Sequence, residues 1–129
     1  MNSNKSDLAV IVKAKDLCGY IMTVTQKSPK VFRFTFVAKL QNLSLEVLEY
    51  LYRANDVFVA KGDLKNREKR LELQREAMTS LKLLMYISEL AYEQKCILFN
   101  QYEQISLLGT ECLNMLGAWM NSDRKRWEA

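Results

Sequence analysis

The side chains best suited to binding chemistry are lysines and arginines, which concentrate in two parts of the sequence. Lys30 and Arg33 follow the single proline, and Arg124, Lys125 and Arg126 form a run near the end. Clustered cations bind nucleic-acid phosphates, because each contact releases a condensed counterion. The sequence therefore makes phosphate contact a candidate function.

Helix-dipole compensation is the competing explanation, and it does not apply equally to all of these cations. Ser28 followed by Pro29 is a helix-start signal, so Lys30 and Arg33 would lie in the first turns of a helix. The helix dipole disfavours a cation there, and an anionic partner explains the placement better. For Lys95 and the cations at 124–126, which would follow helix C-termini, dipole compensation stays open.

Catalytic chemistry has little support, because the 129 residues include no histidine. Its absence excludes Ser/His/Asp and Cys/His nucleophile systems and zinc sites that use imidazole. Cys18, Cys96 and Cys112 lack C-x-x-C spacing and are interpreted as reduced thiols packed as small hydrophobes. We expect no enzymatic activity, no cofactor and no metal.

The composition is that of a folded, mainly helical domain. Apolar residues make up 49% and charged residues 26%, which excludes a disordered chain. Four glycines and one proline are too few for the turns of a β-sandwich. No apolar run approaches the ~18 residues of a membrane span, and the first residues lack an apolar signal segment. We therefore expect a cytoplasmic protein with no membrane partner.

Turn signals divide the chain into helices that form one domain over residues 1–129. The apolar spacing predicts helices at about 6–26, 29–61, 64–95 and 101–122, with Asp63 capping the third and a basic tail at 123–129. Gly109 and Gly117 lie inside the fourth helix, where we expect close helix packing. Short turns force antiparallel neighbours, so the predicted fold is all-α, an up-down-up-down four-helix bundle.

This topology gathers cations that are distant in the sequence. One end of the bundle would hold Lys27, Lys30 and Arg33 near Lys95. The other end would hold Lys61, Lys65 and Arg67 near Arg124, Lys125 and Arg126. The acidic residues concentrate in the middle of the helices, so the modest net charge of +4 conceals two positive ends.

The third predicted helix is apolar on more than one face, which predicts a homo-oligomer. Leu83, Tyr86 and Leu90 extend the apolar surface beyond what one neighbouring helix covers. A second protomer would cover these three residues. Phe32, Phe34 and Phe36 are assigned to core or interface, with base stacking as the alternative.

Three segments resemble one known family. They are Ser28–Thr35, similar to its F-P-K-x-x-R-F-T opening of helix 2; Leu81–Ala91, similar to L-R-x-L-x-x-L-A-x-E/D; and Gln101–Glu103 with Glu111–Trp119, similar to Q-Y-E-H … E-I-G-R-M-L-G-G-W. In this order and spacing the sequence resembles the four-helix-bundle accessory variability determinants of diversity-generating retroelements. A sister group is the bundle proteins encoded in intervening sequences of large-subunit ribosomal RNA.

The resemblance implies a ring-like homopentamer that binds RNA or DNA through a positive surface. It also implies a reverse transcriptase and its template RNA as partners, in mutagenic cDNA synthesis that this subunit does not catalyse. Lys82 stands at a family arginine and joins the candidate phosphate contacts, whereas Asn114 replaces another. The alternative is an oligomeric structural or protein-interaction bundle with no nucleic-acid role.

Overall fold

The computed structural model describes the backbone of residues 5–128 and the side chains of residues 9–128. Residues 1–4 and 129 of the predicted domain lie outside this range. The elements are α1 (Lys5–Thr25), the short turns η1 (Lys30–Phe32) and η2 (Arg33–Val37), α2 (Ala38–Asp56), α3 (Leu64–Glu93) and α4 (Phe99–Glu128). The described residues contain no strand, which confirms the all-α prediction.

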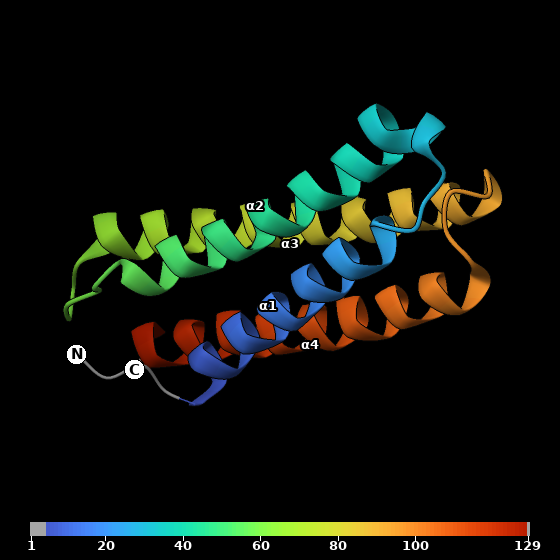
Figure 1. Ribbon diagram of the computed structural model, residues 1–129. Coiled ribbons are helices and arrows are strands. Elements are labelled where there is room, and N and C mark those ends of the chain that lie inside the picture. Colours follow the sequence, from blue (N-terminus) through green and yellow to red (C-terminus); the bar gives the residue numbers. More distant parts are fainter. Residues whose placement is uncertain (1–4, 129) are drawn as a thin grey trace.

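The four long helices form an antiparallel bundle, as predicted. Each helix packs against its neighbours in the chain, and α1 also packs against α4, which closes the arrangement. The α1–α2 and α3–α4 connections lie at one end, while the α2–α3 connection, the start of α1 and the end of α4 lie at the other (Figure 1). No helix among the described residues is long and apolar enough to cross a membrane.

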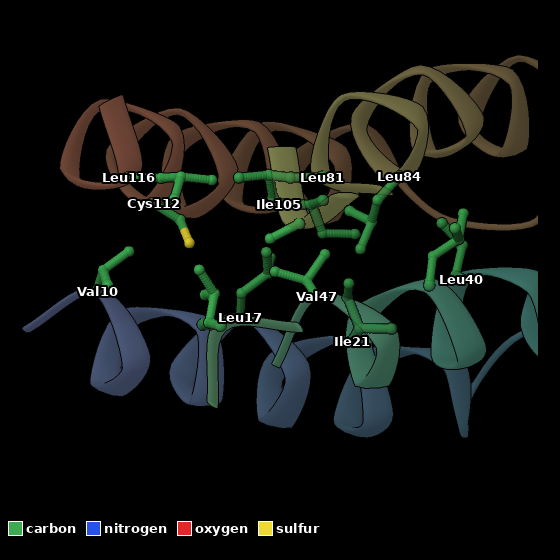
Figure 2. Close-up of a cluster of buried hydrophobic side chains, with 14 of the residues drawn as sticks. Val10, Leu17, Ile21, Leu40, Val47, Leu81, Leu84, Ile105, Cys112 and Leu116 are labelled. Carbon is green, nitrogen blue, oxygen red and sulfur yellow. The ribbon is translucent and has the colours of Figure 1, made fainter. Parts of the chain in front are cut away.

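One apolar core fills the space between the helices. Val10, Leu17 and Ile21 of α1 face the side chains of α3 and α4, including fully buried Leu84 and Leu116 (Figure 2). Burying one such side chain stabilises the fold by about 1.5–3 kcal/mol. The bundle therefore depends on this shared core more than on the propensity of any single helix.

The second predicted helix, at 29–61, is shorter and less regular than expected. Pro29 precedes it in an extended conformation, with φ −56° and ψ 140° and no side-chain cap. A 3₁₀ turn and a π turn then lead into α2. The helix ends at Asp56, because the β-branched, aromatic run after it favours extended backbone, and Val57 has φ −79° and ψ 112°.

The third predicted helix begins as expected and the fourth continues further than expected. The Asp63 carboxylate accepts a hydrogen bond from the Asn66 N–H at 3.0 Å, which confirms the predicted N-cap. α3 ends at Glu93, and Lys95 takes the left-handed conformation beyond it, with φ 67°. α4 continues to Glu128, so residues 123–128 are helical rather than a separate tail.

The two glycines of α4 have different surroundings. A Cβ at Gly109 would lie 2.6 Å from the Met85 sulfur of α3, so this glycine permits close packing, as predicted. A Cβ at Gly117 would meet nothing within 4 Å. The packing prediction is therefore wrong for Gly117.

Candidate nucleic-acid interface

A groove beside the α1–α2 connection brings together two of the predicted phosphate contacts. This turn-end groove has a volume of about 530 Å³, and its lining includes Lys30, Arg33, Phe34 and Gln41. The irregular η1 and η2 turns carry both cations, and a π turn widens the helix at this point. Gln41 fixes the inner wall through a 3.0 Å hydrogen bond to the Thr25 hydroxyl.

The cations of this groove are available to a ligand. Lys30 and Arg33 are exposed, and neither forms an ion pair with any residue that the structure describes. Phe34 lies beside them with 86% of its surface exposed, so it is not a core residue, and its alternative assignment to an interface stays a prediction. Phe32 and Phe36 instead contact each other, with ring centroids 5.8 Å apart, and pack against the core.

Lys95 lies at the same end of the bundle, in the α3–α4 connection (Figure 1). Its backbone is left-handed, a conformation that glycine adopts at lower cost than lysine. The Cys96 N–H donates to the Ala91 carbonyl at 2.8 Å, which closes the helix around this residue. The turn therefore holds an exposed cation in a conformation unfavourable for lysine.

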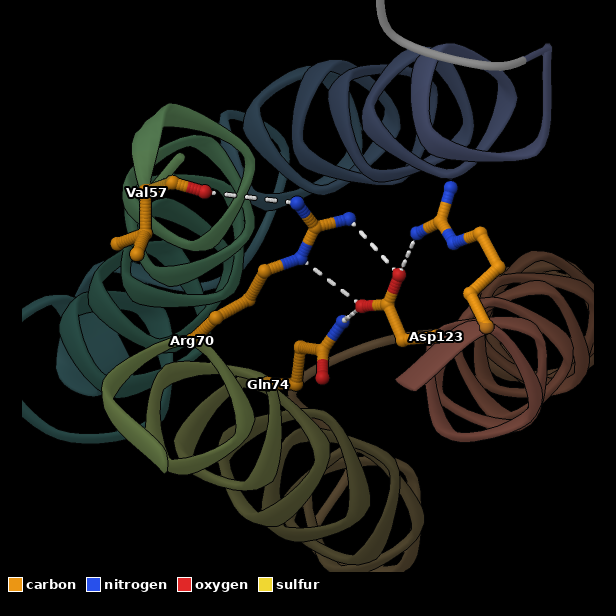
Figure 3. A network of polar contacts seen from close by, with 5 residues as sticks. Val57, Arg70, Gln74 and Asp123 are labelled. Carbon is orange, nitrogen blue, oxygen red and sulfur yellow. Dashed lines mark hydrogen bonds and ion pairs between the residues drawn. The ribbon is translucent and has the colours of Figure 1, made fainter. Parts of the chain in front are cut away.

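The opposite end holds a buried ion pair that the sequence did not reveal. The guanidinium of Arg70 donates to both carboxylate oxygens of Asp123, at 2.9 and 3.0 Å, and the Gln74 amide adds a bond at 2.9 Å (Figure 3). Arg70 also lies over Trp119, its Cζ 5.0 Å from the ring centroid. This network joins α3 to α4 in a position where solvent is excluded.

The three predicted contacts at 124–126 differ in their availability. Arg126 donates to the buried Asp123 carboxylate, so one of its nitrogens has an internal partner. Arg124 bonds to the Asn121 side chain on the surface. Lys125 is exposed and forms no ion pair within residues 9–128. The helical backbone thus separates three cations that a flexible tail would present together.

Lys82 and the predicted oligomer contacts lie along the C-terminal half of α3. Lys82 is exposed and follows Arg75 by seven residues, which places the two on one face of the helix. Leu83 and Leu90 are each 39% exposed and Tyr86 is 69% exposed. These three residues form an unpartnered apolar strip on the single chain.

A second groove, between α3 and α4, combines the predicted contact Arg124 with residues that the sequence analysis did not select, among them Arg75 and Trp127. Its volume is about 380 Å³, and Arg67, Arg75, Arg124 and Trp127 are among its lining residues. Arg67 was expected near this end, and its guanidinium donates to the Trp127 carbonyl at 3.0 Å. The overlooked signal was Trp127 itself, an aromatic residue within the basic segment.

The thiols have the properties of packed side chains. All three cysteines are free and buried. Burial raises the pKa of Cys112 to about 12, against a smaller lowering by nearby Lys13. The described residues contain no group of three or more cysteine, aspartate or glutamate side chains arranged to hold a metal ion.

Comparisons with known proteins give no relative for this chain. No family model matches the sequence, and no match was found among curated proteins or solved structures.

Proposed function

We propose that this chain is a non-catalytic nucleic-acid-binding accessory protein of a diversity-generating retroelement. In this proposal it acts with the reverse transcriptase and its template RNA during mutagenic cDNA synthesis, in the cytoplasm. The proposal rests on the resemblance of three sequence segments and on the chemistry of the turn-end groove.

The turn-end groove is the observation that carries the nucleic-acid proposal. Its Lys30 and Arg33 form no ion pair with the residues that the structure describes, and Phe34 exposes nearly its whole ring beside them. Phosphates pair with such cations, and an exposed aromatic ring stacks on unpaired bases. These residues also lie within the first segment that resembles the family, Ser28–Thr35.

The backbone conformation of Lys95 supports a nucleic-acid site at the same end of the bundle. A non-glycine residue with positive φ is unfavourable, and such strain concentrates at functional sites. A lysine at this position keeps a cation at the bundle end that also carries Lys30 and Arg33 (Figure 1).

The alternative function, an oligomeric interaction bundle without nucleic acid, has an observation of its own. Leu83, Tyr86 and Leu90 leave an apolar strip exposed on α3, and exposed apolar strips mark association surfaces. The proposed homopentameric ring would cover this strip, so the retroelement proposal also includes it. Only nucleic-acid binding separates the two functions, and sedimentation tests the oligomer independently.

Salt-dependent RNA binding tests the proposal. The wild-type protein should bind a short labelled single-stranded RNA in an anisotropy assay, with an affinity that falls steeply as salt rises. Lys30→Glu with Arg33→Glu should remove at least two phosphate contacts and lower the slope of log K against log salt by about 1.4. Lys95→Gly should weaken RNA binding, because it removes a cation, while it relieves the backbone strain at this position.

A matched variant separates this site from general charge. Lys15→Glu with Arg53→Glu makes the same change in net charge, using an exposed lysine and an arginine already paired with Glu49 at 2.8 Å. It should retain most of the binding. Absent or salt-independent RNA binding by the wild-type protein would contradict the proposal. Co-purification of a reverse transcriptase and its template RNA from the native host tests the named partners.

A further inference from the structure

The groove between α3 and α4, named here the Trp127 groove, combines apolar and aromatic surface with arginines. Leu71 and Met120 supply apolar surface beside the indole of Trp127, and Arg67, Arg75 and Arg124 also line it. Its volume of about 380 Å³ lies in the lower part of the range for small-molecule sites. This size fits a single ring system with its substituents rather than a helix.

The indole of Trp127 is held in place by its neighbours. The Cζ atom of Arg67 lies 5.4 Å from the ring centroid, and the same guanidinium donates to the Trp127 carbonyl. Trp127 is only partly buried, so part of its ring remains accessible. An ordered, accessible indole provides a stacking surface at little cost in side-chain entropy.

The charge of the groove favours an anion. Three arginines contribute to the lining, and Glu128 is the single carboxylate among the described lining residues. Arg75 lies 3.9 Å from Glu68, but both side chains are more than 60% exposed, and such a pair contributes little. An incoming phosphate can therefore compete for this guanidinium.

A planar ring beside an anion is the chemistry of a nucleotide. We propose that the Trp127 groove binds one unpaired nucleotide of an RNA strand. The base stacks on Trp127 against Met120 and Leu71, and Arg75 and Arg124 hold the adjoining phosphates. This inference rests on the proposed nucleic-acid function and adds a second contact at the end opposite the turn-end groove.

Tryptophan fluorescence tests the inference directly, because the protein contains two tryptophans with different exposure. Trp119 is fully buried, so quenching by RNA reports on Trp127. A short single-stranded RNA should quench the wild-type emission in parallel with binding measured by anisotropy. Trp127→Phe should bind with little change in emission, because only Trp119 remains.

Two substitutions test the individual contacts. Trp127→Ala should weaken binding of the single-stranded RNA by about 5- to 150-fold, the range for loss of one stacked base. Arg124→Gln keeps the indole and should lower the slope of log K against log salt by about 0.7. Tyr52→Ala removes a ring of α2 that is 66% exposed, and it should leave the affinity within about twofold.

The outcomes separate this inference from the proposed function. RNA that binds by anisotropy without quenching Trp127 overturns the groove assignment and leaves the proposed function standing. Failure of RNA to bind the wild-type protein at all overturns both. An acidic peptide that quenches Trp127 more strongly than RNA at equal concentration identifies the groove as a peptide site and also overturns the inference.

Discussion

The buried ion pair between Arg70 of α3 and Asp123 of α4 makes a strong prediction for Asp123→Asn. The carboxylate accepts from four nitrogens, two on Arg70 and one each on Gln74 and Arg126. Asparagine keeps the shape of the side chain but removes its charge and replaces one acceptor oxygen with a donor. The Arg70 cation, with 6% of its side chain exposed, then loses the Asp123 charge that two of its nitrogens face.

The expected loss is a large fraction of the stability of the fold. Removing one partner of a buried pair costs about 3–5 kcal/mol, because the remaining charge stays desolvated. Domains of this size have a free energy of unfolding of about 5–15 kcal/mol. At about 3–4 °C per kcal/mol for this chain length, the melting temperature should fall by roughly 10–20 °C.

Urea and thermal denaturation followed by helical circular dichroism measure this loss. The control is Glu49→Gln, which removes an exposed i,i+4 pair with Arg53 and should cost at most about 0.5 kcal/mol. The combined variant Arg70→Met, Gln74→Leu, Asp123→Leu should recover most of the stability, since apolar side chains replace both buried charges and the buried amide. An Asp123→Asn protein within about 1 kcal/mol of wild type would refute this account of the network.

Substitutions at three positions of α4 give further predictions. Gly117→Ala should stabilise the protein by about 1 kcal/mol, since its Cβ enters open space in a helix. Gly109→Ala should be less stable than Gly117→Ala by about 1–3 kcal/mol, since its Cβ collides with Met85, and equal melting temperatures would contradict this. Because folding raises the Cys112 pKa to about 12 from 9.0, ionisation of the unfolded thiol should lower stability as pH rises through this window. Cys112→Ala should show a shallower decline in urea midpoints over the same pH range.

The sequence predicted the fold because its strongest signals are local. Apolar spacing and the Asp63 cap place the helices, and short turns require the antiparallel order. The end of α2 was placed too late because Gly62, with φ 80°, resembles a helix stop. The run after Asp56 favours extended backbone, and tertiary contacts add to this preference: Arg70 and Asn66 of α3 donate to the Val57 and Phe58 carbonyls.

The candidate sites were less predictable, because burial of polar residues is not a local property. Arg70 lies seven residues before buried Ala77, and Asp123 lies seven after buried Leu116, so both have core spacing. A search for apolar spacing does not count charged residues as core positions. Asp123 was therefore assigned to the basic tail. The core part of the Phe34 assignment is wrong for the opposite reason, because an aromatic residue at helical spacing is usually buried.

The Arg70–Gln74–Asp123 network also determines how many cations the C-terminal end of α4 presents to RNA. Arg126 has two possible roles, a bond to the buried carboxylate or a contact with phosphate, and its half-exposed side chain connects both environments. Asp123→Asn removes its internal counter-ion and raises the net charge of this end by one. Under the proposed function, this substitution should steepen the salt dependence of RNA binding by up to about 0.7 in slope while it lowers stability. Measured below the melting temperature of the variant, an unchanged slope would mean that Arg126 serves only the fold and leaves binding to Arg124 and Lys125.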